Sequence, residues 1–313
     1  MQEKFLDIIV CPSCKESLSL TKKRVIDEEI LEGLLHCNKC GNAFEITEGV
    51  PRLILNLEER KEIAESFGYQ WEMRAKSKFE SNSLLYGETE EEELKNFFRY
   101  FGITPDDLQG KIILDAGCGC GRLTKALSRF GKEIIGIDIS SSIGMAYQTC
   151  MSGKNTAIIQ ADVLNPPFQK ATFDYVWAED TICYVKEVRK AFDLLSDLVK
   201  PSGKLFVRVP CIDRSCFAVK LRGVLAFSHK ISRRILFCLC YCLAIPWSIM
   251  KLMLRKKSSG LRSNAFFLFN ALSPRFIAYQ NEEEMIMWFK ENHFSDIELI
   301  CDKAIAIRGT KKQ

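Results

Sequence analysis

Short apolar runs alternate with segments of helical periodicity in the middle of the chain. Five of these runs are typical of buried strands, at residues 112–116, 133–138, 157–161, 173–177 and 204–209. Because helical segments separate the runs, parallel pairing is favoured, in which each helix returns the chain to the same edge of the sheet. The pattern predicts an α/β fold with a doubly wound parallel sheet.

Both flanks of this region follow other patterns. Upstream, charged stretches at 57–75 and 90–101 have helical periodicity. Downstream, residues 282–292 predict a helix, and residues 296–301 and 304–309 predict two strands joined by a tight connection. Such a pair suits an antiparallel addition, so we expect a seven-stranded Rossmann-like sheet that ends in an antiparallel hairpin.

Length and composition fit a globular protein. A chain of 313 residues, 47% hydrophobic and 27% charged, is long enough for one large domain and an accessory module. Acids are interleaved at the N-terminus, and no basic segment precedes a long apolar core, so we expect no secretory signal peptide and a cytoplasmic location. Charge is uneven, because residues 1–60 carry 8 Lys/Arg against 11 Asp/Glu, whereas residues 203–262 carry 13 Lys/Arg against the single acid Asp213.

A glycine-rich turn follows the first predicted strand of the sheet. The sequence Asp115-Ala-Gly-Cys-Gly-Cys-Gly121 ends that strand and opens a helix. Glycines let the backbone approach a ligand closely, and a helix N-terminus favours negative charge. Alone, the turn indicates either a nucleotide-like ligand or a purely structural role.

Two acidic residues narrow this interpretation. Asp138 ends the next predicted strand, 21 residues after Gly117, where a carboxylate accepts both hydroxyls of a ribose. NAD-binding proteins share that feature, but the glycines at 117, 119 and 121 do not follow the G-x-G-x-x-G spacing of a dinucleotide fingerprint. Asp162-Val163, after the third strand, is placed to hold an adenine amino group and ring edge, for which dinucleotide enzymes have no special need.

Together these motifs resemble the class I S-adenosylmethionine (SAM)-dependent methyltransferases of type 11, over residues 60–313. The resemblance implies methyl transfer by in-line displacement inside a dry pocket. It also implies cofactor contacts from the glycine loop, the ribose and adenine motifs and the sulfonium end, at Gly117, Cys118, Gly119, Asp138, Ile139, Asp162, Val163, Ala178 and Glu179. Asp115 is expected to orient the loop. Residues 67–71 match a segment that covers the cofactor in the relatives, or form an ordinary amphipathic helix.

Two cysteine pairs lie near the N-terminus. Cys11-Pro-Ser-Cys14 and Cys37-Asn-Lys-Cys40 have 22 residues between them, and four thiolates at such spacing close a tetrahedral zinc shell with no open position. A structural zinc ion suits a segment too small for its own core. Residues 37–53 resemble the zinc-ribbon module that activates methyltransferases as a separate subunit. Some fused relatives methylate ribosomal RNA, but this module is net acidic, which argues against phosphate binding.

Residues 235–250 contain no charge and are bracketed by Arg233-Arg234 and Arg255-Lys256-Lys257. One interpretation is a pair of lid helices over the acceptor pocket, because 16 uncharged residues that include Pro246 are short for a membrane span of about 20. Another is a peripheral contact of residues 233–257 with the inner membrane face, where basic flanks attract anionic lipid. RNA binding would use the same basic residues but leaves the apolar run unexplained.

The catalytic base is poorly specified by the sequence. His36 adjoins a cysteine pair and His293 lies at a predicted helix end, which leaves His229 as the plausible histidine base. Relatives often carry paired histidines where this chain has Cys183-Tyr184. Tyr184 is a second candidate, either to orient an acceptor or simply to pack.

The sequence thus predicts a zinc-ribbon module at 1–57, a helical connector over the cofactor site at 58–108 and a methyltransferase domain at 109–313 with an insertion at 211–270. The predicted function is methyl transfer from SAM to a small-molecule or lipid-linked acceptor. The alternatives are an RNA methyltransferase whose zinc ribbon positions the substrate and a non-catalytic scaffold that retains the fold.

Overall fold

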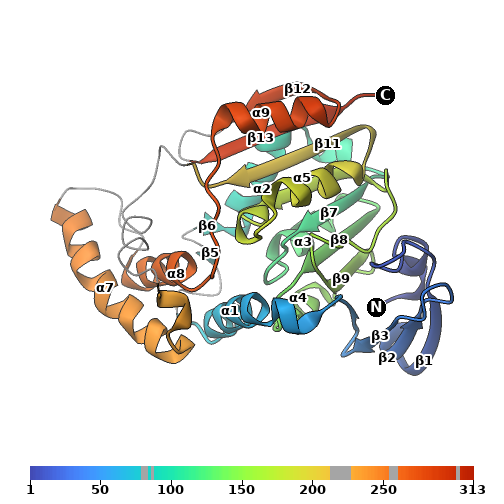
Figure 1. Cartoon of the computed structure of the whole chain (residues 1–313), viewed down its shortest axis with the longest axis horizontal. Coiled ribbons are helices and arrows are strands. Elements are labelled where there is room, and N and C mark those ends of the chain that lie inside the picture. The colour runs from blue at the N-terminus through green and yellow to red at the C-terminus, as the bar shows by residue number, and fades with distance from the viewer. Residues whose placement is uncertain (79–83, 86–87, 212–226, 254–259, 301–303) are drawn as a thin grey trace.

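A computed structural model describes residues 1–78, 84–85, 88–211, 227–253, 260–300 and 304–313. One continuous sheet runs through the molecule. The N-terminal strands lie at one end of the long axis, and helix α7 (Arg233–Met253) lies at the other (Figure 1).

Among the described residues, the sheet has 11 strands. In spatial order these are β1 (Ser19–Ile26), β2 (Glu29–His36), β3 (Ala43–Thr47), β4 (Val50–Leu53), β9 (Thr156–Ala161), β8 (Glu133–Asp138), β7 (Ile112–Ala116), β10 (Phe173–Glu179), β11 (Val199–Val209), β13 (Ile305–Lys311) and β12 (Phe294–Leu299). Strands β4 to β11 in this order pair in parallel, whereas both ends of the sheet are antiparallel. A separate two-stranded sheet pairs β5 (Leu84–Leu85) with β6 (Glu88–Thr89).

Helices cover both faces of the sheet outside the N-terminal module, α5 and α9 on one face and α2, α3 and α4 on the other (Figure 1). Their bounds are α2 (Glu90–Phe101), α3 (Arg122–Leu127), α4 (Ile143–Cys150), α5 (Val188–Asp197) and α9 (Glu282–Glu291). Side chains alternate across each strand, so each face has its own core. Phe97 of α2 lies 5.2 Å from Trp177 of β10, and Phe192 of α5 lies 5.0 Å from Phe289 of α9, between ring centroids.

Helix α2 shows how local sequence sets an element's ends. Thr89 Oγ1 accepts a hydrogen bond from Glu92 N at 3.2 Å, and Thr89 N donates to Glu92 Oε2 at 2.8 Å, which closes a capping box. Four glutamates in the first turn interact favourably with the positive, N-terminal end of the helix dipole. Gly102 ends the helix at φ 61°, a conformation that glycine adopts without strain.

The N-terminal module is joined to the larger sheet rather than set apart from it. Strand β4 pairs in parallel with β9, placing Arg52 opposite Gln160 and Leu53 opposite Ala161. Beyond the sheet, Val10 N donates to the Pro167 carbonyl at 2.8 Å. Lys15 Nζ also donates to a neighbouring carbonyl, that of Pro166, at 2.6 Å. The module therefore holds the segment that follows β9.

The predicted mixed sheet is confirmed, and β7, β8, α1 (Leu57–Ala75) and α2 have the predicted bounds. The other five of the seven predicted strands differ at their ends. Strand β9 begins one residue early, at Thr156, and β13 spans Ile305–Lys311 rather than 304–309. Strand β10 extends to Glu179, and β11 begins at Val199 because residues 200–203 form a bulge opposite β10. Strand β12 begins at Phe294, and Cys301, where we expected it to end, lies outside the described residues. The seven predicted strands are also extended by the four strands of the module, which cover the edge of β9.

The described part of the predicted insertion contains two packed helices, α7 and α8 (Gly260–Leu272). Both pack near α1, through a shared cluster of buried side chains that includes Trp71, Leu236 and Phe269. Residues 212–226 and 254–259, with the predicted basic flank at 255–257, lie outside the described residues. By length and composition alone α7 is apolar enough to cross a membrane, and only 17% of its apolar window is buried.

Candidate cofactor and acceptor site

A cavity of about 680 Å³ opens at the carboxyl ends of the parallel strands. The glycine loop forms one wall. Gly117, Gly119 and Gly121 have φ of 90°, 55° and 77°, the left-handed region that favours glycine. A Cβ at Gly119 would lie 2.6 Å from the ring of Trp71, so glycine is required there for space as well. The loop is held close to α1.

Asp138 lies at the end of β8, beside this loop. Its Oδ2 accepts a hydrogen bond from Gly119 N at 3.0 Å, and its Oδ1 accepts one from Ser140 N at 2.7 Å. Burial raises the pKa of Asp138, and these two backbone donors oppose the shift. Each oxygen keeps a lone pair for a further donor, such as a ribose hydroxyl.

Asp162 follows β9 and reaches the same cavity. Its Oδ1 accepts a hydrogen bond from Leu164 N at 2.9 Å, and its Oδ2 lies 2.7 Å from Nε of Arg60 on α1. This ion pair joins α1 to the predicted adenine end of the site. The sequence offered no sign of it, since nothing in the spacing of Arg60 relates it to Asp162.

Most predicted cofactor residues line this one cavity. Those that do so are Asp115, Gly117, Cys118, Gly119, Asp138, Ile139, Asp162, Val163 and Glu179. Ala178 is fully buried and is not among the described residues that line it. At the predicted sulfonium end, Glu179 forms an ion pair with Arg208. Burial raises the pKa of Glu179, while the Arg208 guanidinium lowers it.

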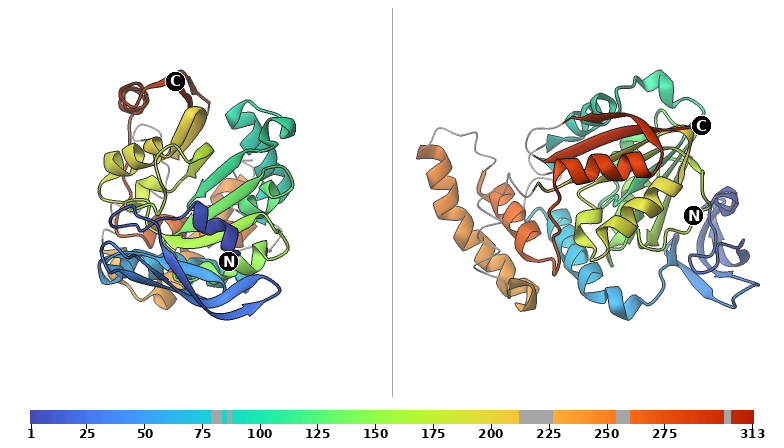
Figure 2. Two further views of the ribbon diagram at one scale, coloured as in Figure 1. Left: turned by 90° about the vertical axis from the view of Figure 1, so that its right-hand side faces the viewer. Right: turned by 45° about the horizontal axis from the view of Figure 1, so that its top comes forward.

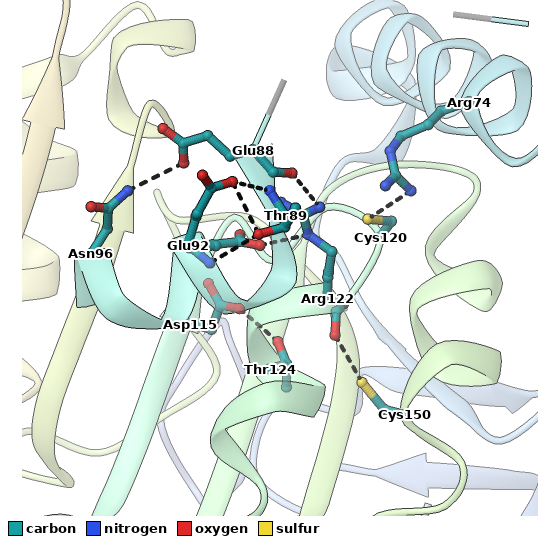
Figure 3. Close-up of polar contacts among 12 residues, drawn as sticks. Arg74, Glu88, Thr89, Glu92, Asn96, Asp115, Cys120, Arg122, Thr124 and Cys150 are labelled. Carbon is teal, nitrogen blue, oxygen red and sulfur yellow. Dashed lines mark hydrogen bonds and ion pairs between the residues drawn. The ribbon is translucent and has the colours of Figure 1, made fainter. Parts of the chain in front are cut away.

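Arg122 ties the glycine loop to α2, as Figure 3 shows. Its Nε lies 2.6 Å from Glu93 Oε2, and its Nη1 donates to the Glu88 carbonyl at 2.9 Å. Burial raises the pKa of Glu93, and the Arg122 charge opposes that shift. Arg74 Nη1 donates to Cys120 Sγ at 3.5 Å in the same view. These long-range contacts were not predicted, because they join segments with no shared spacing signal.

Trp71 on α1 carries an unpaired donor at this site. The residue is 8% exposed and lines the cavity, and its Nε1 has no hydrogen-bond partner among the described residues. A buried N–H without an acceptor costs free energy, so the position fits a ligand or water acceptor. The predicted segment 67–71 thus lies on the glycine loop.

Helices α7 and α8 line the far end of the cavity. Their aromatic members are Trp247 and Phe267, whose ring centroids lie 5.7 Å apart. Asn270 Nδ2 donates to Tyr184 Oη at 3.0 Å, so an amide and a phenol face this end together. The lining from α7 and α8 thus combines two aromatic rings with the polar side chains of Ser263, Asn264 and Asn270. Apolar surface with a few placed polar groups is typical of small-molecule pockets.

The two candidate catalytic residues lie differently. Tyr184, in η3 (Ile182–Tyr184), lines the cavity, and Phe67 packs edge-on against it at 4.9 Å between centroids. His229, in η4 (Ser228–Lys230), is not among the described residues lining the cavity. Of these two residues, Tyr184 is the one that lines the cavity.

The four predicted metal ligands form one cluster. The sulfur atoms of Cys11, Cys14, Cys37 and Cys40 all lie within 4.8 Å of one another. Cys11 Sγ is 3.5 Å from Cys40 Sγ, and Cys14 Sγ is 3.4 Å from Cys37 Sγ. Four converging thiols suit the tetrahedral shell that Zn²⁺ adopts in structural sites.

Comparison with known proteins agrees with this geometry. A methyltransferase-domain family matches residues 114–207, and the Trm112p-like protein family matches residues 2–49. The chain is 27% identical over 125 residues to a chloroplastic tocopherol O-methyltransferase of Arabidopsis thaliana, covering 38% of this chain and 36% of that protein. It is 31% identical over 103 residues to a ubiquinone biosynthesis O-methyltransferase of Coxiella burnetii, covering 32% and 43%.

The chain thus spans less than half the length of either relative. The crystal structure of magnesium protoporphyrin IX methyltransferase from Synechocystis PCC 6803 with bound SAH has a TM-score of 0.50 and 13% identity, covering 81% of this chain and 100% of that one. That likeness shows the fold. The chain therefore carries a methyltransferase domain of the SAM-dependent family and, fused before it, a Trm112p-like domain.

Proposed function

We propose that this protein transfers a methyl group from SAM to a small-molecule or lipid-linked acceptor. One observation supports this most directly: a single cavity extends from the glycine loop, Asp138 and Asp162 to the aromatic and amide side chains of α7 and α8. A cofactor and an acceptor would lie end to end in it. Bringing the two into line supplies much of the acceleration for such a displacement.

Each part of SAM has a matching group in the cavity. Asp138 would accept the ribose hydroxyls, and Asp162 would accept the adenine amino group. The glycine loop and Trp71 would lie beside the methionine part, and Glu179 beside the sulfonium. Bound SAM would supply the reactive methyl group, while the protein residues orient it and exclude water.

The acceptor end favours a molecule with substantial apolar surface. Trp247, Phe267 and Phe276 offer ring faces, while Asn264 and Asn270 offer amide groups to fix an orientation. Relatives include enzymes named for tocopherol and for ubiquinone biosynthesis, which support a lipophilic acceptor. Tyr184 would contact the acceptor, and the raised pKa of Glu179 suits a proton acceptor near neutral pH.

The four-cysteine cluster would hold a structural Zn²⁺. It fits a closed site, since all four ligands come from the protein. The ion would fix the two CxxC turns, and with them the strands that extend the sheet.

SAM binding to the purified full-length protein tests the cofactor site. We expect micromolar-order affinity by calorimetry, and loss of detectable binding in Asp138→Ala. A matched control is Asp106→Ala, which removes an exposed carboxyl outside the cavity. Asp138→Ala protein that folds and binds SAM as tightly as the control would remove the site assignment.

Labelled SAM incubated with lipid, metabolite and RNA fractions tests the acceptor. Label in the lipid or metabolite fraction supports the proposal, and label in RNA supports the second candidate, which the fused Trm112p-like module favours. An RNA acceptor further requires affinity that falls steeply with salt. SAM binding without any labelled product supports a scaffold.

A further inference from the structure

Helix α7 has an unusual distribution of buried and exposed residues. Leu236, Cys240 and Ala244, four residues apart, are fully buried against the body of the protein. The opposite side is apolar too. Apart from Arg234 in the first turn, its exposed described side chains are apolar residues or cysteines. Six of them, which we call the outward stripe, are Ile235, Cys238, Cys242, Ile245, Ile249 and Met253.

The outward stripe follows the period of the helix, with spacings of three or four residues. Ile235, Ile245, Ile249 and Met253 have 63%, 50%, 50% and 79% of their surface exposed. A helix on the surface of a water-soluble protein normally turns charged and polar side chains outward. An exposed apolar stripe of this length indicates an apolar partner.

A shallow basic groove lies beside this helix. It is lined by Lys76, Ser77, Lys78, Phe237, Tyr241 and Arg262. Tyr241 Oη donates to the Lys78 carbonyl, and Arg262 Nη1 donates to the Ser77 carbonyl at 3.4 Å, so α7 and α8 are joined to the end of α1 there. Three cationic side chains and two aromatic rings thus border the apolar stripe, and no acid is among the described residues that line the groove. Lys76 is paired with Glu72 on α1, so Lys78 and Arg262 are the other two cations of the groove.

Position makes this surface accessible. Helix α7 lies at the outer end of the molecule, and α8 lies between α7 and the central sheet, in Figure 1 and in the right-hand view of Figure 2. The Trm112p-like module lies at the opposite end (Figure 1). Nothing among the described residues covers the outward stripe.

We propose that this end of the protein docks on an anionic phospholipid bilayer. The outward stripe would lie among the acyl chains, parallel to the membrane plane, and the basic groove would bind headgroup phosphates. The aromatic rings of Phe237 and Tyr241 would then lie at the interface, where such side chains are favoured. Buried contacts of the other α7 face keep the helix attached to the protein body and oppose a spanning orientation.

Charge decides between a bilayer and a second copy of the chain. A symmetric dimer places the same patch on both sides of its axis, so its basic grooves would approach each other. An anionic surface instead complements them. Docking would also bring Phe267, which lines the cavity and is 39% exposed, toward the lipid. Only this last consequence, delivery of an acceptor from the bilayer, rests on the proposed function.

Vesicle co-sedimentation of the full-length protein tests the surface. We expect binding to phosphatidylcholine vesicles that contain phosphatidylglycerol, and weak binding to phosphatidylcholine alone. Ile245→Ser with Ile249→Ser should reduce the bound fraction at least about tenfold, because two large apolar contacts are lost. Lys78→Gln with Arg262→Gln should abolish the preference for phosphatidylglycerol.

Met287→Ser is the matched control, since Met287 is a 51% exposed apolar side chain on α9, away from α7. Thermal unfolding and SAM affinity of every variant show whether it is folded. The proposal is overturned if the stripe variants bind vesicles as well as the wild type does. It is also overturned if alkaline carbonate fails to release the protein from vesicles, because that result would mean a spanning helix. If the protein self-associates without lipid, and Ile245→Ser with Ile249→Ser abolishes that self-association, the face binds a second copy of the chain instead. If the stripe variants lose vesicle binding but still bind SAM, the result supports docking. That conclusion does not depend on which acceptor the protein methylates.

Discussion

Asp115 is a buried carboxyl at the start of the glycine loop. It is 3% exposed, and burial raises its pKa to about 7, although a hydrogen bond from Thr124 Oγ1 at 2.6 Å opposes the shift. Between pH 4 and 7 the unfolded chain carries the ionised group while the folded protein keeps it protonated. The folded state then binds one more proton, so the stability that this group contributes is lost as pH rises toward 7.

Asp115→Asn tests this directly, because the amide keeps the shape and never ionises. We expect the wild-type free energy of unfolding to fall between pH 5 and 7 by up to about 1.4 kcal/mol per pH unit more steeply than that of Asp115→Asn. Urea unfolding over a pH series measures the difference. Parallel pH profiles of the two proteins would mean that Asp115 is ionised in the folded state.

At the level of single residues, the sequence predicted the positions that follow strands and missed those that reach across the fold. Asp138 and Asp162 end neighbouring parallel strands, so strand order alone brings them together. Arg60 and Glu93 lie on helices of the connector, and no pattern in the chain pairs them with Asp162 and Arg122. His229 was favoured as a base by residue type alone, and it is not among the described residues that line the cavity.

At the level of elements, periodicity predicted helices and strands well where one face differs from the other. Strand β11 was predicted too short, because Pro201, Ser202 and Gly203 resemble a turn although they form a bulge within the strand. Helix α7 was uncertain for a different reason. It is apolar on all sides, so composition cannot show which face packs against the protein.

The two faces of α7 should respond differently to truncation. Leu236→Ala opens a cavity in a fully buried cluster and should lower the free energy of unfolding by about 2–5 kcal/mol. Ile249→Ala removes a half-exposed side chain and should change it by less than about 0.5 kcal/mol. Chemical unfolding without lipid compares the variants. Equal losses in the free energy of unfolding would contradict the burial of only one face of α7.

At the level of the whole molecule, the sequence predicted two domains and their order but not their union into one sheet. Residues 50–53 look like the end of the module, yet β4 pairs with β9. A parallel pair between segments more than a hundred residues apart carries no local signal. The consequence is mechanical: the module supports β9, and Asp162 of the predicted adenine site follows that strand directly.

Metal removal should therefore weaken cofactor binding at a distance. Without an ion the two CxxC turns lose their crosslink, and the module is too small to keep its fold by packing alone. Val10 and Lys15 would then release the carbonyls of Pro167 and Pro166, and the loop after β9 would lose its support. We expect Cys37→Ser with Cys40→Ser, or chelation of the wild type, to lower SAM affinity about tenfold, which corresponds to about 1.4 kcal/mol.

Calorimetry of SAM binding, with released zinc measured in parallel, tests this coupling. Cys238→Ser with Cys242→Ser is the matched control, since it replaces two exposed thiols at the far end of the molecule. Neither control residue lines the cavity, so its SAM affinity should stay unchanged. Because the module supports β9 and the loop after it, where the predicted adenine site lies, the loss should appear for adenosine as well as for SAM. If metal-free protein binds adenosine and SAM as tightly as the control does, loss of the metal does not affect the cofactor site, although the two domains share a sheet.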